Sequence, residues 1–353
     1  MKFNEVFLFG SRAAHHATHS GYEGFSRFAS CKTLSPVPFR WLKSKWGWKL
    51  DTRVARMTGR PLYSFGLLLA ELLGGAHMLV NRHAAYHAIY GDLDLWLLPK
   101  IAKTCKVPLF ATFHEPADIL EWLGIERQLR GLTAVVLVSR SQRDYFKKWF
   151  PLERVFVIPH GVDSEYFQPI IGGLARDPVC ITVGSHLRDF PTLYEAMNYV
   201  WRELPNVKLV AIGTNHHSSD GRLSVEDPRV TYLSKLSDAA LLNCYQCSRL
   251  AIFSFRGMTA SNALLEAMAT GLPVIATRIG GVEEYTGDSA LLCSPKDPRA
   301  MAGHILAVLQ QPALAETMAL KSRERAQSFD FRRIAQMMDE LYRELSDSAL
   351  NTS

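Results

Sequence analysis

The sequence lacks an apolar run of the roughly 18–20 residues that a helix needs to cross a bilayer. Its first residues, Met1 to Glu5, lack the charged-then-apolar layout of a cleaved secretory signal. Cysteine is sparse, with six scattered residues in 353, a pattern that suits reduced thiols better than a disulfide framework. Low-complexity tracts and repeats at solenoid periods are also missing. We therefore expect an ordinary globular protein in the cytoplasm.

The sequence does contain an alternation of short apolar runs and helix-like stretches, which is typical of α/β domains. Its 353 residues exceed what one compact core usually holds. The apolar runs predict strands at 5–10, 77–81, 87–90, 109–113, 134–138, 155–158, 179–183, 207–212, 230–233, 250–253, 274–276 and 290–292. We expect an N-terminal domain of residues 1–165, a C-terminal domain of residues 166–330, and a helix and tail, 331–353, that return to the first domain.

Charge is unevenly distributed along the chain. Residues 1–150 hold 21 Lys and Arg against 11 Asp and Glu, whereas residues 151–353 hold 19 against 23. Much of the basic excess lies in residues 40–56, where three tryptophans are interleaved with six basic residues. Tryptophan favours the headgroup layer and cations favour an anionic leaflet, so this stretch is a candidate membrane-surface contact. A solvated basic face whose tryptophans pack inward is an equal alternative. Nucleic-acid binding is disfavoured because no binding motif accompanies the patch.

One strand-to-helix turn in the second half has the chemistry of an anion site. The predicted strand 250–253 leads through Gly257, which permits close backbone approach, to Ser261 and Asn262, which can cap a helix. The amino end of such a helix is suited to bind a phosphate, and Glu266, one turn inside, can accept hydrogen bonds from a ribose diol. Taken alone, this pattern more often belongs to an ordinary surface helix.

Further motifs accompany this turn. A close resemblance to the family 4 glycosyltransferases of the GT-B fold covers residues 262–276 (NALLEAMATGLPVIA) and the Gly280-Gly281 pair. The segment 157–163 (VIPHGVD) is similar to the family's interdomain segment, and 112–115 and 138–141 match two further landmarks in the correct order. The resemblance implies two Rossmann-like domains that face each other across a cleft. It also implies sugar transfer from a nucleotide-sugar with retention at the anomeric carbon.

The resemblance further implies which residues form the site. The leaving diphosphate requires charge stabilisation, and Arg188 matches the family's cationic phosphate contact, with Ser185 or His186 near the place of a second. His114 resembles the histidine beside the transferred sugar, so His114 and Arg188 are the predicted catalytic residues. The predicted donor-binding residues, which follow strands, are Gly21, Ser185, His186, Arg188, Ser234, Gly257, Thr259, Ala260, Ser261, Asn262, Glu266, Gly280 and Gly281. The predicted acceptor-side residues are His19, Ser20 and Tyr22.

No metal or other cofactor is expected. The family implies no obligatory metal, and the histidines near the first turn have no paired ligands at tetrahedral spacing. Asp92-Leu93-Asp94 is a D-x-D, the metal-binding signature of a different glycosyltransferase fold, and the order of the surrounding motifs argues against that role. Cys244 and Cys247 form a C-x-x-C without a second pair, so we expect them on the buried face of a helix.

One position departs from the family pattern. Relatives commonly carry a second glutamate eight residues before the ribose-binding one, and here that position is Met258. Because a thioether accepts hydrogen bonds poorly, the sugar contacts must come from other groups. An altered donor sugar, a subfamily with its own contacts and an inactive relative are the three interpretations. We favour the second because Arg188, His114 and Glu266 all remain.

Together these features predict a hexosyltransferase that uses a UDP- or GDP-sugar and an acceptor hydroxyl, with a lipid-linked or membrane-surface acceptor as the leading hypothesis. The expected partners are the nucleotide-sugar, the acceptor and an anionic membrane surface contacted through 40–56. Two alternatives remain. A nucleotide-sugar epimerase of the same fold would need acid/base carboxylates near the sugar, which the sequence does not identify. A catalytically silent nucleotide-binding relative is indicated by Met258 alone.

Overall fold

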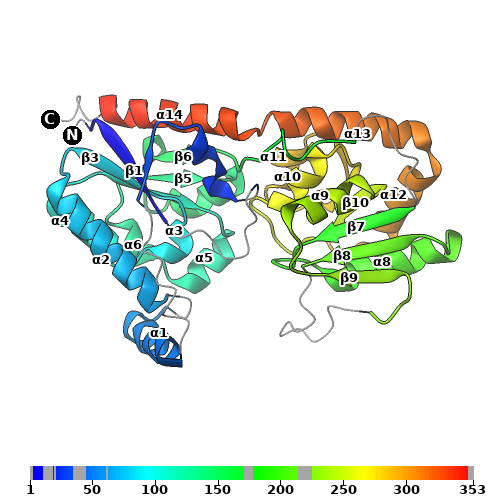
Figure 1. The fold of residues 1–353 in the computed structure, drawn as a ribbon, viewed down its shortest axis with the longest axis horizontal. Coiled ribbons are helices and arrows are strands. Elements are labelled where there is room, and N and C mark those ends of the chain that lie inside the picture. Colours follow the sequence, from blue (N-terminus) through cyan, green and yellow to red (C-terminus); the bar gives the residue numbers. More distant parts are fainter. Residues whose placement is uncertain are drawn as a thin grey trace. The chain divides into compact units, whose positions relative to one another are not determined.

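The protein divides into two compact units. The computed structural model describes residues 3–10, 19, 21–34, 45–60, 63–170, 178–213 and 225–348, and of residues 45–48 and 348 it describes the backbone alone. Unit 1 comprises Met1–Ala14, Phe25–Pro159 and Arg332–Ser353, and unit 2 comprises His15–Gly24 and His160–Phe331. Each unit is built on one six-stranded sheet with helices packed around it (Figure 1).

The sheet of unit 1 is parallel throughout, with the strand order β2-β1-β3-β4-β5-β6. Its strands are β1 (Glu5–Phe9), β2 (Lys32–Thr33), β3 (Ala84–Ala88), β4 (Leu109–Phe113), β5 (Ala134–Leu137) and β6 (Val155–Val157). Every residue of β3, β4 and β5 is buried, as expected for central parallel strands that are covered on both faces. The carboxyl ends of these strands therefore share one edge of the sheet.

The helices of unit 1 are short except for three. They are α1 (Lys45–Thr58), α2 (Phe65–Val80), α3 (Gly91–Asp94), α4 (Leu98–Cys105), α5 (Ala117–Leu123), α6 (Glu126–Leu129), α7 (Arg143–Phe146) and α14 (Phe331–Ser348), with 3-10 turns η3 (Arg140–Gln142) and η4 (Leu152–Arg154). The 3-10 turn η1 (Tyr22–Arg27) begins in unit 2 and ends in unit 1. After its first residue, α14 belongs to unit 1. No helix in the described ranges combines the length and hydrophobicity needed to span a bilayer.

The predicted strand at 77–81 is wrong. These residues form the last turn of α2 and its C-cap, Asn81. The run is apolar on all sides, so hydrophobicity alone did not distinguish a strand from a helix. Packing decides in favour of the helix, because Gly74 and Gly75 let its backbone approach Phe9 and Ile101 closely. The next strand, β3, begins at Ala84 rather than at the predicted 87, and the two-residue β2 was not predicted.

A buried histidine links the sheet of unit 1 to α14. On β3, His87 has its Nδ1 2.6 Å from the Tyr342 hydroxyl and its Nε2 2.7 Å from Thr112 Oγ1. Burial, reinforced by the nearby His114, lowers the pKa of His87 to about 3. The imidazole is therefore neutral in the folded protein at any pH well above that value.

The sheet of unit 2 is also parallel, with the strand order β12-β11-β10-β7-β8-β9. Its strands are β7 (Val179–Val183), β8 (Lys208–Ile212), β9 (Val230–Leu233), β10 (Leu250–Phe253), β11 (Val274–Thr277) and β12 (Ala290–Cys293). Its helices are α8 (Phe190–Glu203), α9 (Asp238–Gln246), α10 (Asn262–Ala269), α11 (Val282–Thr286), α12 (Pro298–Gln310) and α13 (Pro312–Gln327). All six strands predicted for this half are confirmed to within one residue at each end.

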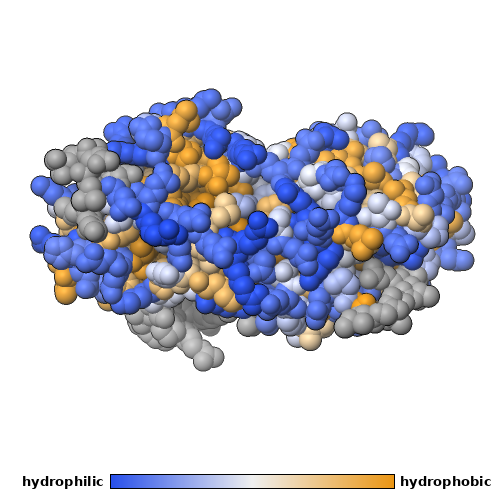
Figure 2. Space-filling model, turned by 90° about the horizontal axis from the view of Figure 1, so that it is seen from above, coloured by the Kyte–Doolittle hydropathy of each residue, from blue (hydrophilic) through white to orange (hydrophobic). Residues whose placement is uncertain are grey.

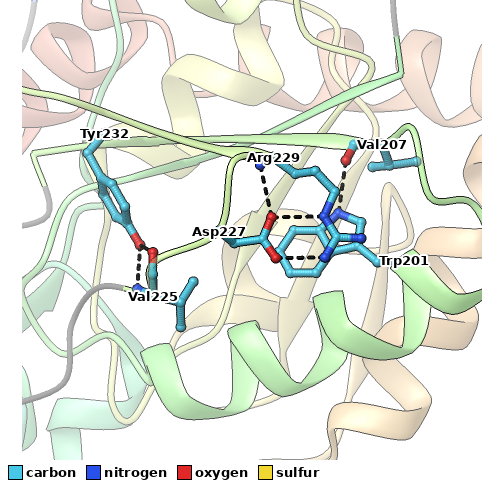
Figure 3. Close-up of polar contacts among 6 residues, drawn as sticks. All are labelled: Trp201, Val207, Val225, Asp227, Arg229 and Tyr232. Carbon is cyan, nitrogen blue, oxygen red and sulfur yellow. Dashed lines mark hydrogen bonds and ion pairs between the residues drawn. The ribbon is translucent and has the colours of Figure 1, made fainter.

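Polar contacts fasten the outer strands of this sheet (Figure 3). Asp227 accepts two hydrogen bonds from the Arg229 guanidinium, at 2.8 Å from Nε and 2.6 Å from Nη2. The guanidinium lies over the ring of Trp201, 4.2 Å from its centroid, and the indole N–H donates to the Val207 carbonyl at 2.8 Å. These contacts stabilise the edge of the sheet and involve none of the predicted site residues.

The C-x-x-C pair lies at the end of α9. Cys244 is half-buried, and Cys247 is the exposed C-cap residue. The prediction of a buried helix face is therefore wrong for Cys247, because the helix ends at Gln246 and the cap turns outward.

The face shown in Figure 2 is mostly hydrophilic, with hydrophobic residues gathered in patches. Single exposed apolar side chains are normal on a protein surface, because polar groups cannot cover it completely. Examples among the described residues are Phe28 and Met337 in unit 1 and Leu320 in unit 2. Isolated residues of this kind carry no functional argument.

The burial of His87 predicts a measurable pH dependence of stability. The pKa of His87 falls from an ordinary 6.5 to about 3 on folding. Between these two values the imidazole is protonated in the unfolded chain but neutral in the folded one. Folding free energy is then lost by up to about 1.4 kcal/mol per pH unit, or about 2 kcal/mol by pH 5. We expect His87→Gln to lose less stability than the wild type between about pH 7 and pH 5 in urea unfolding.

The comparison between variants is needed because Asp92 titrates in the opposite sense. Its pKa is raised to about 7, mainly by burial, so proton uptake there adds stability as the pH falls below 7. A suitable control is Tyr342→Phe, which keeps the imidazole but removes one of its buried partners. It should lower the unfolding free energy by about 1–3 kcal/mol at neutral pH and keep the pH slope of the wild type. Equal slopes in His87→Gln and the wild type would contradict the assignment.

Candidate donor-binding site in unit 2

Two strand-to-helix loops meet at the centre of the sheet of unit 2. The strand order reverses between β7 and β10, so the loops that follow these strands leave the carboxyl edge side by side. Backbone hydrogen bonds join the loops: Arg256 N–H donates to the Leu187 carbonyl at 2.8 Å, and Asp189 N–H donates to the Ser254 carbonyl at 2.8 Å. In open α/β sheets, ligands bind at this reversal point.

The loop after β7 is a tight turn that carries Arg188. Gly184 has a φ of +86°, and Leu187 has a φ of +54°, which is uncommon for a residue with a side chain. A Cβ atom at position 184 would lie 3.3 Å from Nη2 of Arg188, so the glycine leaves room for the guanidinium. The turn thus directs the arginine side chain back over the end of its own strand.

The guanidinium of Arg188 is held by neutral groups. Nη1 donates to the His186 carbonyl at 3.2 Å, and Nη2 donates to the Val183 carbonyl at 2.9 Å and to Ser261 Oγ at 3.3 Å. The group lies over the Phe255 ring, 4.3 Å from its centroid. The predicted residues Arg188 and Ser261, which are far apart in sequence, are therefore in direct contact.

Arg188 is a buried cation. Its side chain is only 7% exposed, and burial lowers the pKa of Arg188 to about 10, with Tyr245 acting in the opposite direction. It therefore remains charged at neutral pH. No carboxylate among the described residues pairs with it, and its buried Nε has no hydrogen-bond partner there. Because an uncompensated buried charge is costly, the position is suited to a bound anion.

Helix α10 supplies the other half of the site. Ser261 is its N-cap, and Ser261 Oγ accepts from Leu264 N–H at 3.3 Å. Glu266, one turn inside, is buried and accepts a hydrogen bond from the Tyr245 hydroxyl at 2.9 Å. Burial and the Glu266 carboxylate raise the pKa of Tyr245 well above its ordinary value, so the tyrosine acts as a donor. Sequence reasoning missed Tyr245, since nothing in α9 indicates that it faces Glu266.

The family-departing residue Met258 is packed inward. Its side chain is buried in the apolar cluster that includes Phe255 and Val282. Its carbonyl accepts from Gly281 N–H at 2.7 Å, and a Cβ atom on Gly280 would lie 2.0 Å from the same oxygen. Gly280 has a φ of +56°. The loop after β11 therefore packs against the backbone of Met258, and this position contributes backbone geometry to the site.

Apart from Gly21, which lies in the segment that follows β1 in sequence, the other predicted donor residues lie on the same loops with one exception. Thr259 is buried, Ser185, Gly257, Ala260 and Asn262 are half-buried, and His186 is exposed. Ser234, the exception, is exposed in the loop after β9, two strands away from β7 in the sheet.

His114 belongs to unit 1, where it follows β4. Its backbone N–H donates to the Asp92 carboxylate at 2.9 Å, and Glu115 N–H donates to the same group at 3.1 Å. The ring Nε2 lies 2.7 Å from the Ile89 carbonyl, and the ring tilts against Tyr90 with centroids 5.0 Å apart. Asp92, the first residue of the D-x-D, thus positions the His114 loop through backbone amides, a role that its sequence pattern did not indicate.

The predicted acceptor-side residue His19 lies in unit 2. Its Nδ1 is 2.8 Å from the Asp163 carboxylate, and its backbone N–H donates to the Asp238 carboxylate at 3.0 Å. Its ring stacks on Tyr166 with centroids 3.7 Å apart and planes 4° from parallel. His19 and the described residues 21–24, which follow β1 in sequence, therefore belong with unit 2.

Gly21 and Tyr22, which are also predicted site residues, are tightly packed. Gly21 has a φ of +113°, and a Cβ atom there would lie 2.6 Å from the Glu23 carboxylate. Tyr22 is fully buried, with its ring centroid 5.1 Å from that of His160. Ser20 lies outside the described residues, as do positions 40–44 of the basic stretch.

The structure thus brings together one candidate site whose residues all belong to unit 2. It consists of Arg188, Ser261 and α10, beside the Gly280-Gly281 turn. Among the described residues, no three His, Cys, Asp or Glu side chains are grouped to hold a metal ion. An open cavity of about 330 Å³ lies at the opposite, amino edge of the sheet in unit 1, lined among others by Lys103, Lys106 and Arg130. It contains none of the predicted site residues.

Both halves of the chain match known glycosyltransferase families. Residues 177–311 match the family described as "Glycosyl transferases group 1", and residues 54–166 match "Glycosyltransferase Family 4". The chain belongs to the family 4 glycosyltransferases. The family 4 match contains His114, and the group 1 match contains Arg188 and Glu266. The two six-stranded Rossmann-like units are those of the GT-B fold, so the predicted family and fold class are confirmed.

Individual relatives agree with this family. A D-inositol 3-phosphate glycosyltransferase of Saccharomonospora viridis is 26% identical over 80% of this chain and 74% of its own. Sulfoquinovosyl transferase SQD2 of Arabidopsis thaliana is 25% identical over 49% of this chain, and the match spans only 36% of that protein's length. The solved structure of Anabaena HepE in complex with UDP-glucose superimposes with a TM-score of 0.68 at 16% identity, covering 97% of this chain and 100% of that one.

The close approach at Gly280 predicts a sharp sensitivity to a single methyl group. Gly280→Ala would place a Cβ atom against the Met258 carbonyl and strain the positive φ, so the loop must move. We expect a loss of about 2 kcal/mol or more in thermal or urea unfolding. The matched control is Gly303→Ala on α12, where no atom lies within 4 Å, and it should be neutral or slightly stabilising. Comparable losses in both variants would contradict the steric argument.

Because Met258 is buried, we expect that a glutamate at this position destabilises the protein. Met258→Glu would place a carboxylate in the apolar cluster, so we expect a loss of several kcal/mol in unfolding free energy, with the added acid mostly protonated. Met258→Leu conserves volume and should cost less than about 1.5 kcal/mol. Urea unfolding of the two variants checks the expectation. A Met258→Glu protein as stable as Met258→Leu would show that this side chain can turn toward the site.

Proposed function

We propose that the protein transfers a hexose-type sugar from a UDP- or GDP-sugar to an acceptor hydroxyl, with retention at the anomeric carbon and without an obligatory metal. Arg188 is the observation that carries the proposal: a charged, buried guanidinium with an unpartnered Nε and no carboxylate partner among the described residues. A nucleoside diphosphate would supply the missing anion. The site stands at the sheet position where α/β folds bind such ligands.

The chemistry assigned to the site is charge stabilisation. In the proposed step, the bond between the anomeric carbon and the leaving phosphate oxygen breaks, and the acceptor oxygen bonds to that carbon on the same face. The acceptor proton passes to the leaving phosphate. Negative charge grows on the diphosphate in this step, and Arg188 with the amino end of α10 at Ser261 and Asn262 would stabilise it. No catalytic nucleophile is required.

Glu266 is proposed to hold the ribose. Its carboxylate accepts a hydrogen bond from the Tyr245 hydroxyl, which orients it, and an ionised carboxylate can accept several hydrogen bonds at once. His114 is proposed to contact the transferred sugar from the loop that Asp92 positions. Because Met258 faces the core, sugar contacts are assigned to backbone around Gly257 to Ala260. This arrangement suits a subfamily with its own sugar contacts.

The acceptor is proposed to be lipid-linked or held at an anionic membrane surface in the cytoplasm. The basic, tryptophan-rich stretch 40–56 motivates this proposal. Its described part includes the exposed cations Lys49, Arg53 and Arg56 on α1. HepE bound to UDP-glucose, and the inositol-phosphate enzyme, are consistent with a UDP-sugar donor and a hydroxyl acceptor.

Two substitutions test the donor site. We expect Glu266→Gln to weaken binding of UDP or GDP by about 10-fold, through the ribose contact. We expect Arg188→Gln to weaken binding further and to lower turnover by about 100-fold or more, because charge stabilisation is lost. Isothermal titration calorimetry with each nucleotide and a nucleotide-sugar transfer assay measure the two effects. Thermal unfolding of each variant checks that the fold is kept.

Matched controls are Glu195→Gln and Arg202→Gln on α8, both of which are exposed and should bind nucleotide as the wild type does. Unchanged affinity in Glu266→Gln would remove the ribose assignment. Nucleotide binding without transfer to any acceptor would favour a silent relative. Turnover of a nucleotide-sugar to its epimer without an acceptor would favour the epimerase.

A further inference from the structure

Helix α2 is buried on one face and carries exposed apolar side chains on the opposite face. Its inward face is formed by Glu71, Gly74, Gly75 and Met78, which are buried. Its outward face carries large apolar side chains that are strongly exposed: Leu72 at 46%, Leu73 at 49%, Leu79 at 53% and Val80 at 83%. A helix that is hydrophobic all round is normally buried all round. Here one face has no partner among the described residues of unit 1.

The outward face continues along the helix. The exposed positions 72, 73, 76, 79 and 80 follow helical spacing and form one stripe, on the side away from Gly74 and Gly75, which face Leu98 and Ile101 of α4. Figure 1 shows α2 beside α4, with α1 near the amino end of α2. A contiguous exposed apolar stripe of this kind marks an interaction surface, unlike a scattered leucine.

The described exposed charged residues of α1, of α2 and of the turn that follows α2 are all cations. Exposed cations lie on α1 at Lys49, Arg53 and Arg56, and just beyond the carboxyl end of α2 at Arg82. The acidic residues of α1 and α2 are only two, and both are engaged inward. Asp51 accepts from Phe65 N–H at 2.8 Å, and buried Glu71 accepts from the amide groups at the start of α4. No exposed carboxylate of these two helices opposes an anionic partner.

We propose that the outward face of α2, with the cations of α1, docks on an anionic lipid bilayer. An apolar helix face with cations near both ends of the helix has the chemistry that enters the boundary between headgroups and acyl chains. A neutral protein surface would match the leucines but not the uniform positive charge. The inference rests on the proposed function, because it assumes an acceptor at a membrane. It narrows the proposed membrane contact from the whole stretch 40–56 to a defined surface, in which α2 provides the apolar part.

The test uses the full chain and co-sedimentation with phosphatidylcholine vesicles, with and without phosphatidylglycerol. The wild type should bind the anionic vesicles and lose most of that binding at high salt. Leu72→Gln/Leu79→Gln should weaken binding by about 10-fold or more, because the apolar contact is removed while helix propensity is kept. Lys49→Gln/Arg53→Gln/Arg56→Gln should weaken it by about 100-fold, at about five-fold per cation.

The matched control variants make the same kinds of substitution on unit 2. Leu320→Gln removes a leucine that is 69% exposed on α13 of unit 2, and Arg202→Gln/Lys208→Gln/Arg299→Gln removes three exposed cations of unit 2. Both should bind vesicles as the wild type does. Thermal unfolding of every variant excludes loss of fold, and the charge variant remains informative if the leucine variant is unstable.

Several results would overturn the proposal. Equal sedimentation of the wild type by neutral and anionic vesicles, or sedimentation by neither, would overturn it, as would binding of the α2 variant at the wild-type level. A wild type that is dimeric by light scattering, with a monomeric α2 variant and unchanged vesicle binding, would assign the stripe to a second copy instead. Calorimetry with UDP and GDP separates this from the donor site: the α2 and α1 variants should keep wild-type nucleotide affinity, and loss of vesicle binding alone leaves the proposed transfer intact.

Discussion

The buried charge of Arg188 is the constraint on which the candidate site depends. The guanidinium of Arg188, a residue that is only 7% exposed, is held by two carbonyls and a serine hydroxyl and is stacked on Phe255; it is charged, yet no described carboxylate balances it. Such a charge is expensive to bury. The fold sustains it with a turn that has two positive-φ residues, Gly184 and Leu187, and with backbone hydrogen bonds between the loops after β7 and β10. Strain and charge are concentrated at the same place, which is the usual situation at a functional site.

Backbone geometry and side-chain chemistry have separate roles around this charge. The Met258 side chain is buried in the core, and its carbonyl accepts a hydrogen bond from Gly281 N–H. Gly280 packs against the same carbonyl and leaves no room for a Cβ atom. Tyr245 gives its hydroxyl to Glu266 and fixes the carboxylate. The glutamate that the family commonly has at position 258 is therefore replaced by packing. Sugar contacts made by the backbone, as proposed, would tolerate this change, because the loop positions are set by the glycines.

The sequence predicted the family and the fold because the features that indicate them are local in the chain. Strands in unit 2 are short apolar runs between turn residues, and the motif around Glu266 is contiguous, so both can be read along the chain. What could not be predicted depends on three-dimensional packing. The run 77–81 became helix because Gly74 and Gly75 allow close packing of α2, and Tyr245 and Asp92 act on groups more than twenty residues away. The placement of His19 in unit 2 depends on its contacts with Asp163, Tyr166 and Asp238, none of which its own sequence neighbours indicate.

The inward face of α2 shows that its exposed leucines are not a sign of loose packing. Buried Glu71 accepts hydrogen bonds from the amides of Trp96 and Leu97 at 2.7 Å and of Leu98 at 3.0 Å, and it also bonds the Tyr63 hydroxyl. One carboxylate thereby satisfies the first turn of α4, where free amides would otherwise be left unpaired. A helix placed this firmly gains nothing for folding from leucine or valine on its solvent side, where charged residues would be equally compatible with the helix. The apolar stripe therefore has its physical explanation outside unit 1, in a surface that can accept it.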